Sequence, residues 1–367
     1  MKRARQIVVV GWTAIALWSC SGNGSTAPEG HGRNYQMGFS FYPTVFQSAQ
    51  PQQFVMNFRV RADLVTVHWD GNIPWPLLAK CPDLENCDPG DDSLLIAMHA
   101  NLKQTVQGLV QQTGFFKRDP NKSVYLAVSP LNIDRDAIVN TYAGLRAEPP
   151  GSTFAAPEVT EYYNRFVTYM VTQFEPDYFT QVIEINMYAV NRPDDFMNLV
   201  RLAQDVFETI KTDHPLMPTA PTIQWEFYKV GWDTPGRSGL LDSLASNWYD
   251  YADFYAFSTY PNIRLDQTTV DSSWYRFDQY GLGNVANSAL MISECGIQPL
   301  MQRDLLRTLS RLLQRHNGIA LNYFFLEDMD HLDFPPSFRD VGLYHDKQSP
   351  TLTPHPGLAA WDSLYAL

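Results

Sequence analysis

Apolar runs of strand length alternate with longer segments of helical period along most of this chain. Repeated strand and helix units of this kind build a parallel sheet that is covered by helices. Eight such units predict an α/β fold with one closed (β/α)8 TIM barrel, which we place at residues 36–367. The eight runs are Gln36–Phe41, Leu64–Trp69, Val124–Ser129, Val182–Met187, Thr219–Trp225, Phe254–Tyr260, Ala289–Glu294 and Ile319–Leu326, and the main helical segments between them are 94–112, 160–174, 194–212, 240–248 and 303–316.

The N-terminal segment has the features of a secretory signal. Three basic residues precede an apolar run over 7–17, which is too short to span a bilayer. The run leads to Leu17-Trp18-Ser19-Cys20, which resembles a bacterial lipoprotein signal over residues 1–20, with Cys20 as the lipid-carrying residue. Trp18 departs from that pattern, and an ordinary signal peptide with a chance cysteine is the alternative. Residues 21–35 are rich in Gly, Ser and Pro and predict a flexible tether.

These features predict a protein of the bacterial cell envelope, lipid-anchored at the outer membrane or in the periplasm, or secreted. The net charge of −12 argues against nucleic acid or an anionic membrane surface as a partner, whereas a neutral carbohydrate is compatible with it. The lipid anchor is the expected link to the membrane. We expect no nucleotide cofactor, because the chain has neither a phosphate-binding loop nor a dinucleotide-binding fingerprint. We expect no metal either, because the candidate ligands Asp328, Asp330, His331 and Asp333 are irregularly spaced in a segment that is typical of a solvated loop. It also lacks the Gly-x-Ser-x-Gly turn of serine hydrolases.

The cysteine pattern indicates one disulfide. Cys81 and Cys87 enclose a short loop, and an oxidising compartment would allow them to pair. Zinc binding is the weaker interpretation, because no second pair of ligands follows at a suitable spacing. Cys295 has no evident partner and is expected to be a free, packed thiol.

Two glutamates, Glu184 and Glu294, lie in apolar runs that are expected to be buried strands. An ionised carboxylate is costly to bury unless it is paired or has a chemical role. An ion pair with an arginine in the barrel interior is the structural interpretation. The functional interpretation is glycoside hydrolysis, in which two carboxyl groups flank a sugar and one of them protonates the leaving oxygen.

Other polar and aromatic residues follow the expected strand ends, where the active sites of such barrels lie. Aromatic faces can stack on sugar rings, and carboxylates can accept hydrogen bonds from sugar hydroxyls. His68 is equally well explained as a hydrogen-bonded core residue, and the tryptophans as packed core. The candidate substrate-binding residues are His68, Asp70, Trp75, Trp225, Glu226 and Tyr260.

Taken in order, these segments resemble the glycoside hydrolases of clan A, which are retaining (β/α)8 enzymes. The resemblance implies that Glu184 is the acid/base ending strand four and Glu294 the nucleophile ending strand seven. Ile292-Ser293-Glu294-Cys295-Gly296 is similar to the nucleophile segment of several families in that clan. Ser258-Thr259-Tyr260-Pro261 is similar to the strand-six segment whose tyrosine bonds the nucleophile. The order of motifs resembles galactanase-like bacterial proteins of uncharacterised specificity.

One position departs from the clan, because Ile183 occupies the place of the asparagine that usually precedes the acid/base glutamate. Strand alternation would put Asn186 on the same face as Glu184, where it can replace that asparagine. A rival alignment puts Asn186 in the asparagine position and Met187 in place of the glutamate, which would leave no acid.

The preferred alignment implies a retaining glycoside hydrolase that cleaves β-glycosidic bonds in a poly- or oligosaccharide by two-glutamate double displacement. The alternative is a non-catalytic, glycan-binding surface lipoprotein on the same barrel.

Overall fold

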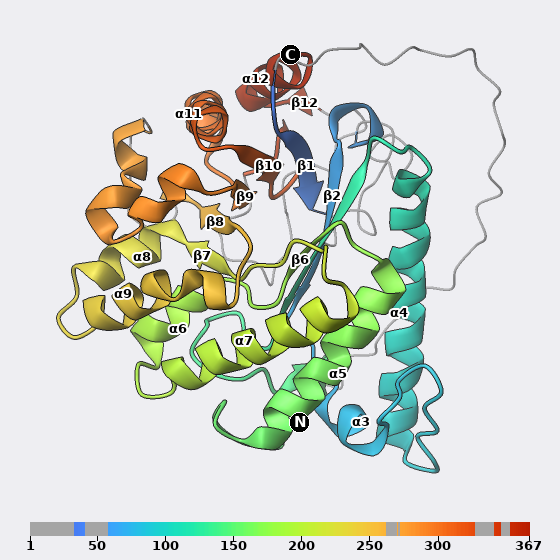
Figure 1. The fold of residues 1–367 in the computed structure, drawn as a ribbon. Coiled ribbons are helices and arrows are strands. Elements are labelled where there is room, and N and C mark those ends of the chain that lie inside the picture. Colours follow the sequence, from blue (N-terminus) through green and yellow to red (C-terminus); the bar gives the residue numbers. More distant parts are fainter. Residues whose placement is uncertain (1–32, 41–57, 262–269, 271, 327–340, 346–352) are drawn as a thin grey trace, which may run out of the picture.

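The computed structural model describes residues 33–40, 58–261, 270, 272–326, 341–345 and 353–367 (Figure 1). The expected signal segment, Cys20, most of the expected tether and the acidic segment 328–333 lie outside the described residues. The described part begins within the expected tether, where Arg33 is buried and pairs with Asp63 at 2.6 Å. None of the helices in the described part is long and apolar enough to cross a membrane.

A ring of eight parallel strands forms the centre of the molecule, which confirms the TIM barrel (Figure 1). Each strand except β6 pairs with the next strand of the ring in sequence, and β10 pairs with β1. Between β6 and β7 the ring is completed by a parallel bridge from Phe179 to Thr219. The strands are β1 Gln36–Ser40, β2 Leu64–Asp70, β3 Ser123–Ser129, β6 Tyr178–Thr180, β7 Thr222–Gln224, β8 Tyr255–Thr259, β9 Leu290–Cys295 and β10 Gly318–Tyr323.

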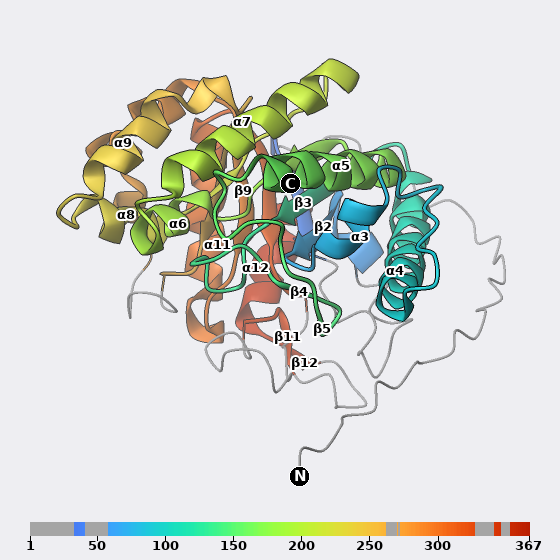
Figure 2. The same ribbon diagram turned by 90° about the horizontal axis from the view of Figure 1, so that it is seen from below.

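Helices surround this ring as an outer layer, which is clearest in the second view (Figure 2). The five main helical segments expected from the sequence appear as α4, α5, α7, α9 and α11. The helices are α3 Trp75–Lys80, α4 Ser93–Lys117, α5 Pro157–Phe174, α6 Ile185–Asn191, α7 Phe196–Asp213, α8 Trp225–Trp232, α9 Ser238–Ser246, α11 Gln302–Arg315 and α12 Pro356–Tyr365. Short 3-10 turns and two small hairpins, β4 Thr141–Tyr142 with β5 Leu145–Arg146 and β11 Tyr344–His345 with β12 Thr353–Pro354, lie in the connections.

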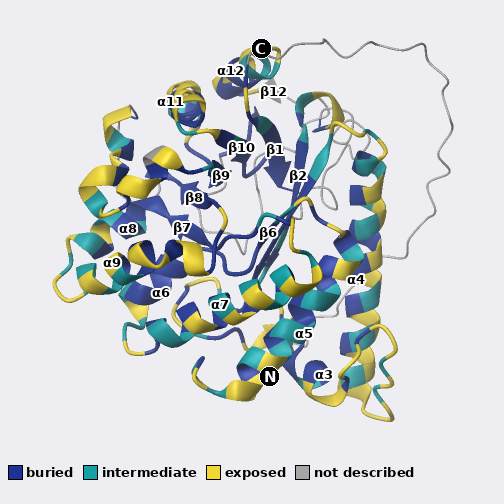
Figure 3. Cartoon of the chain, in the orientation of Figure 1, coloured by how far each residue is buried: buried dark blue, intermediate teal, exposed yellow. Residues whose placement is uncertain are grey.

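The core lies inside the ring and between the ring and the helices, as the buried strands of Figure 3 show. The outer helices are amphipathic: α7 buries Leu199, Ala203 and Val206 on one face and exposes polar residues on the other. A close approach of two strands requires Gly38, because a Cβ added there would lie 2.5 Å from the Leu64 carbonyl oxygen. The sheet can therefore close tightly around its interior.

The expected fourth strand, Val182–Met187, is wrong in its position. The strand is β6, Tyr178–Thr180, and Glu184 follows it with a left-handed backbone, φ 55° and ψ 45°. The helix α6 begins at the next residue. Periodicity cannot separate a short buried strand from a buried turn of helix, because both are continuously apolar.

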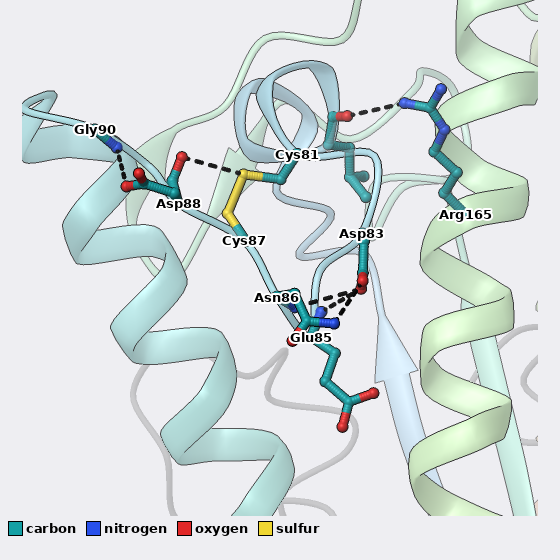
Figure 4. Close-up of a disulfide and its surroundings, with 9 residues drawn as sticks. Cys81, Asp83, Glu85, Asn86, Cys87, Asp88, Gly90 and Arg165 are labelled. Atoms are coloured by element: carbon teal, nitrogen blue, oxygen red, sulfur yellow. Dashed lines mark hydrogen bonds between the residues drawn. A yellow bond between two sulfur atoms is a disulfide. The ribbon is translucent and has the colours of Figure 1, made fainter.

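The structure joins Cys81 and Cys87 by a disulfide, with Cα atoms 5.3 Å apart (Figure 4). Cys81 directly follows α3, and the loop between the cysteines is held by Asp83. The carboxylate of Asp83 accepts hydrogen bonds from the backbone N–H groups of Glu85 and Asn86 and from the Asn86 amide. Cys295 is a free, buried thiol.

Candidate active site

Glu184 and Glu294 lie at the carboxyl-terminal ends of the strands, which we call the barrel mouth. Glu294 belongs to β9, and Glu184 follows β6. Only 7% of Glu184 and 5% of Glu294 is exposed. Burial raises the pKa of the Glu294 carboxyl well above its usual range, and the negative charge of Glu184 raises it further. The two carboxyl groups therefore interact electrostatically and are best treated as one pair.

Glu184 contacts a hydroxyl donor and a guanidinium group. The Ser258 hydroxyl donates a hydrogen bond to Oε1 at 2.7 Å, and Nη2 of Arg135 lies 3.4 Å from Oε2. The backbone N–H of Glu184 donates to the Thr222 hydroxyl at 2.7 Å. This hydrogen bond holds the left-handed residue, whose conformation costs roughly 1 kcal/mol in an L-amino acid. Strain of this kind is often found at functional sites.

Arg135 brings a buried positive charge to the mouth from the loop after β3. Its guanidinium donates two hydrogen bonds to the carboxylate of Asp70, at 2.8 and 2.7 Å, and one to the Asn132 carbonyl at 2.9 Å. Burial alone would lower the pKa of Arg135, but Asp70 and Glu184 outweigh it and leave that pKa above its ordinary value. Asp70 therefore serves to hold Arg135, which in turn faces Glu184.

Glu294 has a different set of neighbours. The Tyr260 hydroxyl donates to Oε2 at 2.8 Å, whereas Oε1 has no hydrogen-bond partner among the described residues. Nε2 of His68 lies 3.3 Å from Oε1. Burial lowers the pKa of His68 to about 4, so its imidazole is neutral at pH 7. Arg135 lies within ion-pair distance of Glu184, and its positive charge also opposes the rise in the pKa of Glu294.

Two predicted sugar-stacking residues are instead buried in the layer between strands and helices. Trp75 is 1% exposed and donates from Nε1 to the Val139 carbonyl at 2.7 Å. Trp225 is fully buried and packs edge-on against Phe257. In β8, Phe257 alternates with Ser258, which faces Glu184, so Phe257 and Trp225 lie on the outer side of the sheet. Neither ring offers a face to a ligand at the mouth.

Two further candidates are used for structure. Asn186 lies in α6 and not beside Glu184 on a strand. Its side chain exchanges two hydrogen bonds with the backbone of Gln224, at 3.0 and 2.8 Å. The side chain that was expected to replace the missing asparagine is therefore already engaged.

Glu226 is fully buried in the first turn of α8. Its carboxylate accepts hydrogen bonds from Gln224, Thr259, the Tyr260 backbone and Trp274, at 2.7 to 3.1 Å. Glu226 supports the backbone that carries Tyr260.

Sequence reasoning did not include Arg135, Ser258 and Thr222 in the site, although all three contact Glu184 or its backbone. A signal existed for Ser258, which belongs to the same segment as Tyr260. Arg135 stands in an Asp134-Arg135-Asp136 loop that reads as solvated surface, yet it is 3% exposed. Within the described residues, no group of three or more His, Cys, Asp or Glu side chains is arranged to hold a metal ion.

No protein-family model matches this sequence, and a search of curated proteins finds no match. Solved structures do resemble it. A GH5_18 protein from Bifidobacterium longum subsp. longum, in complex with Manb1-4GlcNAc, has a TM-score of 0.61 at 11% identity, covering 90% of this chain and 78% of its own. Xylanase 10B from Thermotoga maritima has a TM-score of 0.54 at 10% identity, covering 90% and 95%.

The beta-glycosidase from Thermosphaera aggregans has a TM-score of 0.55 at 11% identity, and the match covers 93% of this chain and 97% of that one. In all three matches nearly the whole described barrel is aligned. The chain therefore has the same barrel fold as a xylanase and a beta-glycosidase.

Proposed function

We propose that this protein is a retaining glycoside hydrolase that cleaves β-glycosidic bonds in a neutral poly- or oligosaccharide. The observation that carries the proposal is the pair formed by Glu184 and Glu294 at the barrel mouth. Glu184 contacts a hydroxyl donor and a guanidinium group, and Glu294 has a raised pKa and an oxygen without a hydrogen-bond partner among the described residues. A retaining glycosidase needs one protonated and one ionised carboxyl group. Two of the proteins with the same barrel fold, a xylanase and a beta-glycosidase, are named for this class of reaction.

The proposed reaction has two steps. One carboxylate attacks the anomeric carbon while the other carboxyl group gives its proton to the departing glycosidic oxygen, forming a covalent glycosyl-enzyme. The second group, now ionised, removes a proton from water, whose oxygen attacks the anomeric carbon and releases the first carboxylate. Each group thus returns to its starting state.

We assign Glu294 as the nucleophile and Glu184 as the acid/base, following their places along the barrel. Burial and the charge of Glu184 raise the pKa of Glu294, so this assignment requires a bound sugar to lower that pKa and leave Glu294 ionised when it attacks. Since the two groups are coupled, a change in the surroundings of either one redistributes the proton. Tyr260 supports the assignment, because its hydrogen bond to Oε2 stabilises the ionised form of Glu294.

The test of the function is release of reducing sugar from a panel of β-glycans by the wild type, Glu184→Gln and Glu294→Gln. Glu158→Gln, an exposed carboxylate in the first turn of α5, is the matched control. Activity in the wild type and the control, but in neither site variant, is the expected result. Saturable glycan binding with no hydrolysis, unchanged in both site variants, would instead favour the non-catalytic glycan-binding protein.

The two roles can be separated with an aryl β-glycoside and added azide. In the variant that lacks the acid/base, a good leaving group still departs, and azide then traps the glycosyl-enzyme as a β-glycosyl azide. In the variant that lacks the nucleophile, azide attacks directly and gives the α-glycosyl azide. We expect the β product from Glu184→Gln and the α product from Glu294→Gln. The opposite pattern would exchange the roles.

We also propose that Cys20 carries a lipid that anchors the protein at the cell envelope. The support is the signal-like segment that ends at this cysteine and the Gly, Ser and Pro-rich stretch that follows it. Labelling with a radioactive fatty acid in a bacterial host tests this. Incorporation into the wild type and none into Cys20→Ala is expected, and equal labelling of the two would contradict the anchor.

A further inference from the structure

A hollow of about 340 Å³ lies on the outer flank of the barrel, between α11 and the 3-10 turn Ser272–Tyr275. The helix α11 belongs to the outer layer beside β9 and β10 (Figure 1). Three arginines, Arg307, Arg311 and Arg315, line the hollow together with Ser272, Tyr275 and Thr308. The arginines are four residues apart, so they lie on one face of α11. None of these six residues belongs to the pair at the barrel mouth.

The three guanidinium groups have no ion-pair partner among the described residues and stand together on one helix face. Most other ion pairs of the described chain use arginine, including Arg33 with Asp63 and Arg61 with Asp362. Within the same described ranges, Arg307, Arg311 and Arg315 make no ion pair and no side-chain hydrogen bond. All three are exposed. Like charges at this spacing repel each other and destabilise a helix, and a bound anion would remove that repulsion.

The remaining lining groups suit a ligand that carries hydroxyls as well as a negative charge. The Thr308 hydroxyl donates to the Val270 carbonyl at 3.3 Å, which leaves its oxygen able to accept a hydrogen bond. Asp304 at one end of the hollow pairs only with its neighbour Arg303, at 3.3 Å, and can also accept from a hydroxyl. Burial lowers the pKa of His316, which therefore adds no charge at neutral pH. The positive charge in the hollow comes from the arginines.

We propose that this hollow binds a small hydroxylated molecule bearing an oxyanion, such as a sugar acid or a sugar phosphate. Guanidinium groups bind carboxylates and phosphates through paired hydrogen bonds, and three of them in succession offer several such pairs. The volume lies at the lower end of small-molecule sites, which matches a ligand of about one or two sugar rings. The arginines are exposed, but they line a hollow rather than a flat face, which favours a discrete ligand over a flat membrane surface. The proposal is independent of hydrolysis at the barrel mouth.

The experiment is isothermal titration of the full protein with glucuronate and with glucose 6-phosphate, at fixed ionic strength. Glucose and sodium chloride serve as ligand controls. Arg311→Gln removes the central charge, and glutamine has nearly the helix propensity of arginine, so the fold should persist. Arg303→Gln is the matched control, because it removes one positive charge from the same helix outside the hollow.

We expect at least one of the two anions to bind saturably to the wild type and to Arg303→Gln, with at least tenfold weaker binding to Arg311→Gln. Thermal melting of each variant confirms that it is folded. Equal binding by Arg311→Gln and the wild type would overturn the site, as would no binding of either anion. Cosedimentation with phosphatidylglycerol vesicles that depends on Arg311, without binding of either soluble anion, would overturn it in favour of a membrane contact.

Discussion

Glu226 and Glu294 are both buried glutamates at the mouth ends of β7 and β9, the two strands that flank β8, yet their surroundings are opposite. Glu226 accepts hydrogen bonds from four donors that occupy both carboxylate oxygens. Glu294 accepts one from Tyr260, and its Oε1 has no hydrogen-bond partner in the described part of the chain. A carboxylate that is fully hydrogen-bonded is part of the scaffold. A buried carboxylate with an oxygen that accepts no hydrogen bond is available for chemistry.

The same contrast is visible in the electrostatics. Burial raises the pKa of both carboxyls, but for Glu226 the hydrogen bonds from Tyr260, Thr259 and Trp274 oppose the shift. For Glu294 the charge of Glu184 adds to it. A folded-state pKa above the unfolded value means that the folded protein holds a proton that the unfolded chain has released. Stability therefore falls as pH rises from the ordinary glutamate range towards the folded pKa.

The largest effect is expected from Glu294→Gln. Hydrolysis should fall by roughly 10³-fold or more, because a group that reacts directly is removed. The free energy of unfolding at pH 7 should not decrease, because the variant no longer buries this carboxyl group. The dependence of that free energy on pH should become flatter. Steady-state rates and urea unfolding at several pH values measure both. A variant that is inactive because it is unfolded would break the comparison.

The second effect is expected from the isosteric change Glu226→Gln. Its amide NH2 would face donors that now bond to a carboxylate, so roughly 2–3 kcal/mol of unfolding free energy should be lost. The rate of hydrolysis by the folded fraction should change less than about tenfold, in contrast to Glu294→Gln. Urea unfolding and active-site titration separate the two quantities. If Glu226→Gln abolished turnover without loss of stability, Glu226 would be a reacting group.

Tyr260→Phe removes the hydrogen bond that links the two regions, because Glu226 holds the backbone of Tyr260 and Tyr260 holds Glu294. A hydrogen bond to a charged group contributes about 1.5–3 kcal/mol, so kcat/KM should fall by roughly 10- to 100-fold. Loss of this donor should raise the pKa of Glu294 further, and the pH profile of kcat/KM should move to higher pH. Tyr188→Phe, which removes a donor to Asp195 at 2.9 Å, is the control and should leave the profile unchanged.

The smallest expected effect is a shift in the pKa of Glu294 when Glu184 loses its charge. The charge of Glu184 raises the pKa of Glu294, so Glu184→Gln should lower that pKa. The pH range over which stability declines should move to lower values and become narrower. Stability measured between pH 4 and 8 in the wild type and the variant shows the shift. An unchanged curve would mean that the two carboxyl groups are not coupled.

Much of the barrel and part of the candidate site could be predicted from the sequence. Particular residues show which features could not. The Glu294 segment and Tyr260 were identified because strand, turn and motif coincide within a few positions. The strand expected to carry Glu184 is wrong in its bounds, because a buried turn and a buried strand have the same apolar pattern. Trp75, Trp225 and Glu226 were assigned to the mouth because they follow strand ends. Which way each side chain points depends on packing that the local pattern does not specify.

The sequence by itself determined the eight strand and helix units and hence the barrel, because hydrophobic periodicity is encoded within each segment. It also determined which cysteines pair, since Cys81 and Cys87 lie close along the chain. Only the tertiary structure decided that Arg135 reaches Asp70, 65 positions away, and faces Glu184. It also decided that Oε1 of Glu294 lies beside a neutral His68. Those contacts exist because barrel closure brings the ends of separate strands together, and their energies depend on distances that no single segment contains.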